Sequence, residues 1–96
     1  MDPERISDFI ISDVVVSTAG RDRGQFFYVI KEEQNFLYLA NGKDRTLDKP
    51  KLKKRRHIQK VLRSETRVAE KLRAGDKVLD SELRRDLAYL SREMQK

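Results

Sequence analysis

The sequence contains no cysteine and a single histidine, His57. The absence of cysteine excludes disulfides, thiolate metal ligands and a cysteine nucleophile. A lone histidine without carboxylates or cysteines beside it cannot build a metal site. We therefore expect no metal and no other cofactor, and we expect the protein to work in a reducing compartment, the cytoplasm.

Long hydrophobic runs are also absent. Residues 10–11 and 14–16 are hydrophobic, but Ser12 and Asp13 interrupt them, and the residues that precede them are largely polar. Only 38% of the 96 residues are hydrophobic, while 40% are charged. The chain is therefore expected to form one small domain with a limited core. We expect neither a signal peptide nor a membrane span.

Catalytic motifs are missing as well. No serine lies in a G-x-S-x-G sequence, and no Walker loop or G-x-G-x-x-G loop is present. Glu32 and Glu33 are adjacent, so on a strand they would point to opposite faces and could not act as a carboxylate pair. We expect no enzymatic activity.

The sequence does have an excess of positive charge, concentrated in its middle. The net charge is +6; residues 43–63 carry ten cations against two acids, whereas residues 1–42 are net −3 and residues 64–96 net +1. Residues 49–63, the basic run, hold eight cations and no acid. Such a run repels itself unless an anion neutralises it, and binding phosphates releases counterions. We expect the run to lie unpaired at one edge of the fold and to bind RNA; a solvated charged surface for any polyanion is the alternative.

The hydrophobic pattern predicts β-strands in the first two thirds of the chain. β-Branched and aromatic residues favour strands, and Asn41-Gly42 is typical of a hairpin turn because both residues tolerate positive φ. The expected strands are residues 14–16, 25–30, 35–40, 43–47 and 52–58. Short strands joined by tight turns indicate a small β-barrel.

After residue 62 the hydrophobic period becomes helical. Ser64 is expected to cap a short helix that ends near Ala74-Gly75, and Asp80 or Ser81 to cap a second helix. The hydrophobic positions of the second helix are Leu83, Leu87, Leu90 and Met94. The predicted organisation is a tail over residues 1–9, a barrel over residues 10–62 and a helical extension over residues 63–96.

Alternation along the strands divides their side chains between two faces. One set is expected to fill the barrel and includes Phe27, Val29, Leu37 and Leu39. The other set comprises Phe26, Tyr28, Phe36 and Tyr38. Its members could stack on bases or lie under the helices. We favour the helices, because the apolar stripe of the second helix needs a partner.

The loop over residues 17–24 carries Arg21-Asp22-Arg23 between two glycines. Glycine permits positive φ and close backbone approach, and the free N–H groups and arginines of such a loop can meet phosphate. A plain hairpin loop with solvated arginines is the alternative. Residues 13–30 resemble the KOW motif, in which a strand, a short basic loop, a fixed glycine and a second strand follow one another. Gly24 occupies the position of the motif glycine.

The resemblance continues in residues 36–43, Lys49-Pro50-Lys51 and residues 56–58. Over residues 10–60 the chain resembles the archaeal and eukaryotic-type large-subunit ribosomal KOW proteins and their short bacterial relatives, the KOW-domain RNA-binding proteins. This resemblance implies an SH3-like β-barrel that contacts ribosomal RNA through its loops and a basic strand, with a role in translation and no catalysis. KOW domains also occur in transcription elongation factors, which leaves a transcription-associated role open.

The expected RNA-binding residues come from the loop, the Asn-Gly turn and the basic run. They are Arg21, Arg23, Gly24, Lys43, Arg45, Lys49, Lys51, Lys53, Lys54, Arg55, Arg56, His57 and Lys60. His57 would donate a hydrogen bond to RNA or else be an ordinary strand residue. The expected partner is RNA, as ribosomal RNA of the large subunit or the ribosome, and not a membrane. The alternative function is a protein-interaction adaptor that docks through the barrel and the C-terminal amphipathic helix.

Overall fold

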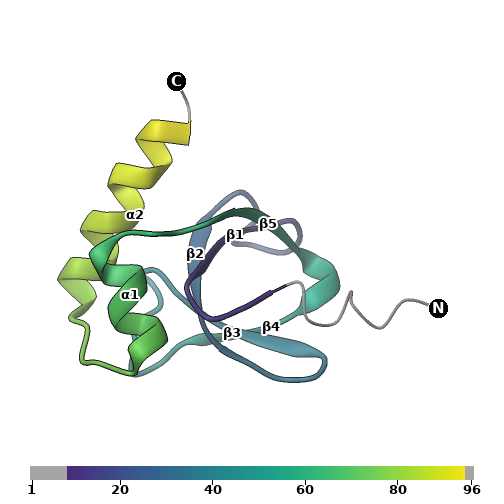
Figure 1. Ribbon diagram of the computed structural model, residues 1–96. Helices are drawn as coiled ribbons and strands as arrows, with labels where there is room; N and C mark the ends of the chain where they lie inside the picture. The colour runs from purple at the N-terminus through teal and green to yellow at the C-terminus, as the bar shows by residue number, and fades with distance from the viewer. Residues whose placement is uncertain (1–8, 95–96) are drawn as a thin grey trace.

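The computed structural model describes residues 9–94. Its elements are the strands β1 (Asp13–Ser17), β2 (Phe26–Glu32), β3 (Phe36–Ala40), β4 (Lys51–Lys54) and β5 (Ile58–Arg63), the 3₁₀ helix η2 (Arg55–His57), and the helices α1 (Arg67–Ala74) and α2 (Asp80–Met94). The strands form one antiparallel sheet in the order β4-β3-β2-β1-β5. Both helices lie together on one side of the strands (Figure 1). The prediction of a mainly β fold with C-terminal helices is confirmed; most of the expected tail, residues 1–8, lies outside the described residues.

The sheet has to curl because of how its edges are connected. The edge strands β4 and β5 are joined only through the three residues of η2. The register of the ladders shifts between Val14 and Val15 and between Val29 and Lys31. Irregularities of this kind bend a strand and increase its twist. They allow the two edges of the sheet to approach each other.

One side of the sheet is filled as the alternation predicted. Phe27, Val29, Leu37 and Leu39 are at most 1% exposed. They form a cluster with Val15 and Ile58, from β1 and the start of β5. The prediction that these four side chains are interior residues is confirmed.

The other side of the sheet is covered by the helices, but only in part. Tyr28 lies in a cluster with Leu83, Leu87 and Leu90 of α2, and Phe26 packs against the same cluster. The helix cover expected for the second aromatic set is therefore confirmed for Phe26 and Tyr28. It is wrong for the remaining two, Phe36 and Tyr38, which belong to neither buried cluster and stay partly exposed.

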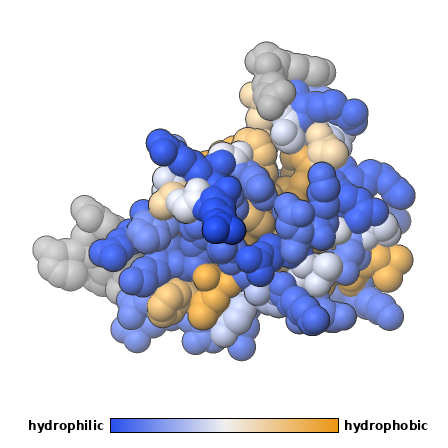
Figure 2. All heavy atoms as spheres, turned by 180° about the vertical axis from the view of Figure 1, so that it is seen from behind, coloured by the Kyte–Doolittle hydropathy of each residue, from blue (hydrophilic) through white to orange (hydrophobic). Residues whose placement is uncertain are grey.

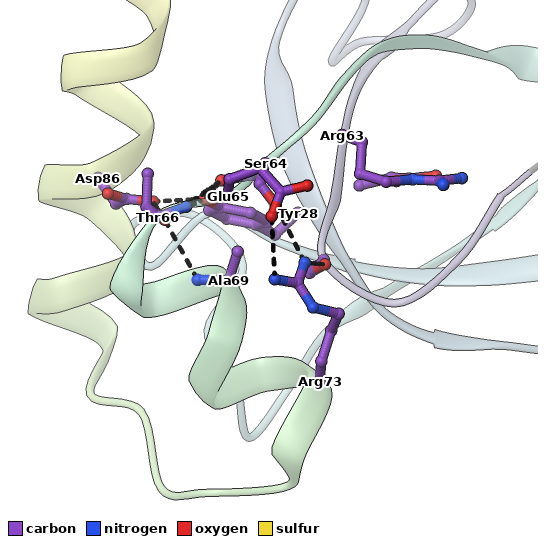
Figure 3. Close-up of polar contacts among 10 residues, drawn as sticks. Tyr28, Arg63, Ser64, Glu65, Thr66, Ala69, Arg73 and Asp86 are labelled. Atoms are coloured by element: carbon purple, nitrogen blue, oxygen red, sulfur yellow. Dashed lines mark hydrogen bonds and ion pairs between the residues drawn. The ribbon is translucent and has the colours of Figure 1, made fainter.

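Polar contacts around Tyr28 fix the helices to the sheet (Figure 3). The Tyr28 hydroxyl donates to the Asp86 carboxylate on α2 and is hydrogen-bonded to Ser64, while the Thr66 hydroxyl donates to the same carboxylate at 2.8 Å. Burial raises the pKa of Tyr28 to about 12, and the bond to the Asp86 carboxylate adds to the effect. Tyr28 therefore stays a neutral donor, and its buried hydroxyl is fully satisfied.

Thr66, not Ser64, caps α1. The Thr66 side chain accepts a hydrogen bond from the Ala69 N–H at 3.2 Å. Ser64 is buried and engaged with Tyr28 instead. The predicted end of the helix is confirmed, because the chain turns at Gly75 in the left-handed conformation.

The helix α2 begins at Asp80 itself, so neither Asp80 nor Ser81 precedes it as a cap. The Leu79 N–H donates to the Glu82 carboxylate at 2.9 Å, and this bond, with one from Lys71, lowers the pKa of Glu82. The Asp80 carboxylate accepts instead from the Leu47 N–H at 2.8 Å. Asp80 therefore joins the start of α2 to the loop between β3 and β4.

Residues 43–47 do not form the expected strand. The Asn41 side-chain oxygen accepts from the N–H groups of Lys43 and Arg45 at 2.9 and 3.0 Å. The Arg45 carbonyl accepts from the N–H groups of Asn41 and Gly42. These bonds use the backbone groups that a returning strand would need for a ladder, so the segment closes into a compact loop.

The strand expected over residues 52–58 is divided by η2. The Arg55 N–H donates to the Asn35 carbonyl at 3.1 Å. The Arg55 guanidinium donates to the carbonyls of Glu33 and Gln34. Arg55 thus holds the chain against the turn between β2 and β3, and η2 redirects it into β5.

Candidate nucleic-acid interface

The loop between β1 and β2 presents two arginines to solvent. Arg21 and Arg23 are exposed, whereas Asp22 between them is buried. The Arg23 N–H donates to the Gly20 carbonyl at 3.2 Å, which closes the tip of the loop. The prediction that these arginines lie in a tight loop is confirmed.

Asp22 clamps this loop to β4. Lys53 is 8% exposed, and its Nζ lies 2.7 Å from Asp22 Oδ1 and 2.7 Å from the Ala19 carbonyl oxygen. The Ser17 hydroxyl donates to Asp22 Oδ1 at 2.7 Å. Lys51 Nζ lies 3.4 Å from Asp22 Oδ2. Lys53 is therefore part of the scaffold, since its charge is already matched within the chain.

Because of the Asp22 clamp, the stability of the fold should depend on pH in the acidic range. Burial by itself raises the pKa of Asp22, but hydrogen bonds from Lys53 and Ser17 and the charges of Lys53 and Lys51 outweigh it, so the pKa falls from 3.8 to about 2. A carboxylate with a lowered pKa stabilises the fold above its unfolded pKa. We expect that contribution, about 2 kcal/mol, to be complete above pH ~4 and to disappear as the pH falls to ~2.

Urea unfolding of the wild type and of Asp22→Asn at a series of pH values from neutral down to ~2 measures the effect. The variant should be less stable near neutral pH by at least this amount, and the difference should shrink on acidification. Asp44→Asn is the matched control, because Asp44 is exposed and should change stability by less than about 0.5 kcal/mol. A difference between wild type and Asp22→Asn that does not vary with pH would contradict the clamp.

Three of the six remaining cations of the basic run also meet carboxylates, which corrects the expectation that the run is unpaired. Arg55 Nη2 lies 3.4 Å from Glu32 Oε1. Lys60 Nζ and Arg63 Nε each lie 3.4 Å from a carboxylate oxygen of the fully buried Asp13. The acids come from distant parts of the sequence and reach the run through the pairing of β1 with β5 and the turn after β2.

Positive charge nevertheless remains in excess. The eight cations of residues 49–63 face three carboxylates in the described part of the chain, which leaves five charges uncompensated. Within residues 9–94, Lys49, Lys54 and Arg56 have no carboxylate partner, and all three are exposed. The surface seen from behind is mostly hydrophilic, with hydrophobic side chains in small separate areas (Figure 2). A polar, positively charged exterior suits a wet interface with a polyanion.

Arginines that are far apart in the sequence converge beside β4. Arg21, from the loop between β1 and β2, and Arg45, from the loop between β3 and β4, line one hollow of about 180 Å³ together with Lys51. Asp22 and Asp44 also line it. Since Lys53 already neutralises Asp22, three cations there face one free carboxylate. The arrangement can hold an anion such as phosphate between two loops.

Other predicted site residues lie elsewhere. Lys43 lines a separate groove beside α2, together with Arg84 and Leu87. Lys60 is held on β5 by Asp13. Gly24 has φ +89° with open space where a Cβ would lie, so its backbone conformation, and not close approach, calls for glycine. His57 is half-buried, and its carbonyl accepts from the Thr18 N–H at 2.9 Å.

Sequence reasoning missed the acids that organise this surface. Asp13 is 0% exposed and Asp22 9%, although aspartate is rarely buried unless it is paired. The available signal for Asp22 was its position between two arginines in a tight loop. No local signal marked Asp13, because its partners Lys60 and Arg63 come from β5, which is distant in the sequence although it pairs with β1.

Two kinds of feature are absent from residues 9–94. In this range no group of three or more histidine or acidic side chains is arranged to hold a metal ion. Neither of the helices described there has the length and hydrophobicity needed to cross a bilayer. Comparison of the sequence with models of protein families and with curated proteins finds no match.

Proposed function

We propose that the protein is an RNA-binding protein of the KOW type, with an SH3-like barrel, whose target is ribosomal RNA of the large subunit. It would bind through a basic face that we define as the exposed or partly exposed cations of the two loops and the β4–η2 segment, without Lys43, which lines a separate groove, and Arg55, which is bonded to the turn after β2. The members of this basic face are Arg21, Arg23, Arg45, Lys49, Lys51, Lys54 and Arg56.

The observation that carries the proposal is the hollow shared by Arg21, Arg45 and Lys51. Three segments of the chain bring cations to one place. Asp22 meets Lys51 there but is already neutralised by Lys53, so the cations outnumber the remaining carboxylate, Asp44, and repel one another. A phosphate group removes that repulsion and accepts charge-assisted hydrogen bonds from arginine. The cost of assembling the hollow is thus offset when a polyanion binds.

The order of the elements supports RNA as the polyanion. The chain runs from β1 through the arginine loop and Gly24 into β2, which is the order of the KOW motif that residues 13–30 resemble. The motif supports RNA as the target but leaves a transcription-associated role open. The wider resemblance over residues 10–60 to ribosomal KOW proteins favours ribosomal RNA. Compensation of Asp13 and Asp22 by the chain's own lysines and arginines keeps these acids from repelling phosphate.

Docking of a protein through α2 is the less favoured function. The stripe expected to bind a partner, at Leu83, Leu87 and Leu90, is at most 9% exposed and packs on the chain's own sheet. A protein partner would therefore have to use another surface or displace the helix.

Fluorescence anisotropy with labelled hairpins of large-subunit ribosomal RNA tests the proposal. With roughly six to eight phosphate contacts, affinity should fall on the order of 10³-fold or more between about 50 and about 200 mM salt. RNA hairpins should outcompete duplex DNA at equal salt, and the protein should sediment with large subunits. A preference for duplex DNA would favour the transcription-associated role, and affinity that does not depend on salt would contradict phosphate recognition.

A further inference from the structure

The outer face of β3 and β4 carries aromatic rings that the helices leave uncovered. In the antiparallel ladder Phe36 lies opposite Lys54 and Tyr38 opposite Leu52, and directly opposite residues share a face of the sheet. Leu37 and Leu39, on the other face, are 0% exposed. Phe36 and Tyr38 are partly exposed, and Leu52 is 49% exposed. The rings therefore stand on the side of the sheet that faces away from the interior.

One of these rings forms the wall of a hollow. Phe36 lines a space of about 420 Å³ together with Asn35, Lys54, Arg55 and Arg56, a volume in the range of small-molecule sites. An aromatic wall offers a stacking surface, and the Asn35 amide offers both a donor and an acceptor to the edge of a base. The hollow thus combines the two features by which proteins hold an unpaired base.

The cations around the hollow have different parts. Arg55 is fixed by Glu32 and by the carbonyls of Glu33 and Gln34, so it shapes the wall of the hollow. Lys54 and Arg56 are exposed, and no carboxylate in residues 9–94 pairs with them. These two are placed to contact the phosphates on either side of a base held at the ring.

Tyr38 continues the surface along the strand. It is two residues beyond Phe36, so the two Cα atoms lie roughly 6.5 Å apart and the side chains share one face. Lys31 Nζ lies 5.4 Å from the centre of the Tyr38 ring, and its charge is matched by Glu33 at 3.6 Å. Successive bases of an extended strand can therefore each meet one ring.

From this arrangement we infer that the outer face of β3 and β4 binds an unpaired segment of RNA, with one base stacked on Phe36 and the next on Tyr38. Lys54 and Arg56 bind the adjoining phosphates. The inference rests on the proposed RNA-binding function and adds to it a class of target, a hairpin loop, bulge or single-stranded junction beside a duplex. The basic face then contacts the backbone, and the ring pair contacts the bases.

A short single-stranded RNA that carries 2-aminopurine, whose emission changes on stacking, tests the inference with the full chain. Wild type should change the emission, whereas Phe36→Leu and Tyr38→Leu should each lose most of that change and bind about tenfold more weakly. Tyr89→Leu is the matched control, because Tyr89 is a 49% exposed aromatic residue on α2 and should behave as wild type. The use of two separate ring variants keeps the test valid if one of them fails to fold.

The outcomes separate this inference from the proposed function. Equal binding and equal emission changes for wild type and both ring variants would overturn the inference. The inference is also overturned if wild type binds an RNA hairpin but leaves the 2-aminopurine emission unchanged. In that case the proposed RNA-binding function is still supported. If wild type binds neither RNA, the proposed function fails together with the inference.

Discussion

Replacing Arg21, Arg45, Lys54 and Arg56 together with alanine is expected to weaken binding to a ribosomal RNA hairpin by about 10³-fold near 0.1 M salt. Each cation that contacts a phosphate contributes nearly one unit to the dependence of log affinity on log salt concentration. The slope of that plot should therefore fall by about three to four units. Anisotropy titrations over a series of salt concentrations measure both quantities. All four residues line the hollows of the proposed interface.

A second fourfold variant separates the position of charge from its amount. Arg67, Lys77, Arg85 and Arg92 are exposed cations of the helical region, and replacing them with alanine removes the same charge from outside the basic face. This control should lose much less affinity and keep most of the salt dependence. If both variants weaken binding equally, RNA responds only to net charge and the basic face has no special role.

The choice of cations matters because part of the basic run maintains the fold. Lys53 is 8% exposed and bonded to Asp22 and Ala19, while Arg55 holds η2 against the turn after β2. Alanine at Lys53 would leave the buried carboxylate of Asp22 without its main partner, which is strongly destabilising. A variant that includes Lys53 or Arg55 would confuse lost binding with lost structure.

Gly42→Ala is expected to be among the most destabilising single changes in the chain, by more than about 4 kcal/mol. Gly42 has φ +77°, and a Cβ there would lie 2.3 Å from the Asp80 carbonyl oxygen and 2.9 Å from the Arg84 backbone nitrogen. Both contacts are with the backbone at the start of α2, which cannot move without losing its bonds to the loop at Leu47 and Gly42. Urea unfolding followed by circular dichroism measures the loss.

Gly24→Ala is the comparison that isolates this close approach. Gly24 also has positive φ, at +89°, but nothing lies within 4 Å of the position of its Cβ. Its replacement should cost only the strain of a left-handed alanine, roughly 1–2 kcal/mol. Similar losses for the two variants would show that backbone strain alone explains them and that α2 does not press on Gly42.

The sequence predicted well where a regular side-chain pattern extends over a whole element. The strands around residues 14–16, 25–30 and 35–40 follow from β-branched and aromatic runs, and their alternation identified Phe27 and Val29 as interior residues. The second helix and its buried face follow from hydrophobic residues that recur every three or four positions. The backbone geometry of a strand or a helix fixes which side chains share a face, so this pattern can be read from the sequence.

The prediction of a strand over residues 43–47 failed because other groups bind its backbone. The Asn41 side chain accepts from the N–H groups of Lys43 and Arg45, and a distant segment adds further contacts. Asn41-Gly42 has the chemistry of a hairpin turn, but α2 settles against Gly42 and Asp80 binds the Leu47 N–H. Residues 43–47 therefore form a loop that contacts the start of α2. Part of the interface was likewise out of reach: the sequence indicated Arg21 and Arg45 separately, but not that they line one hollow.

The sequence alone determines three features: an excess of cations after residue 42, a β region with alternating side chains and an amphipathic C-terminal helix. The tertiary structure decides which cations remain available, because charge is neutralised through space and not along the sequence. Strand pairing brings Asp13 to Lys60 and Arg63, and loop closure brings Asp22 to Lys51 and Lys53. Coulombic attraction depends on the distances that folding creates, and those distances leave Lys54 and Arg56 exposed beside an uncovered aromatic ring.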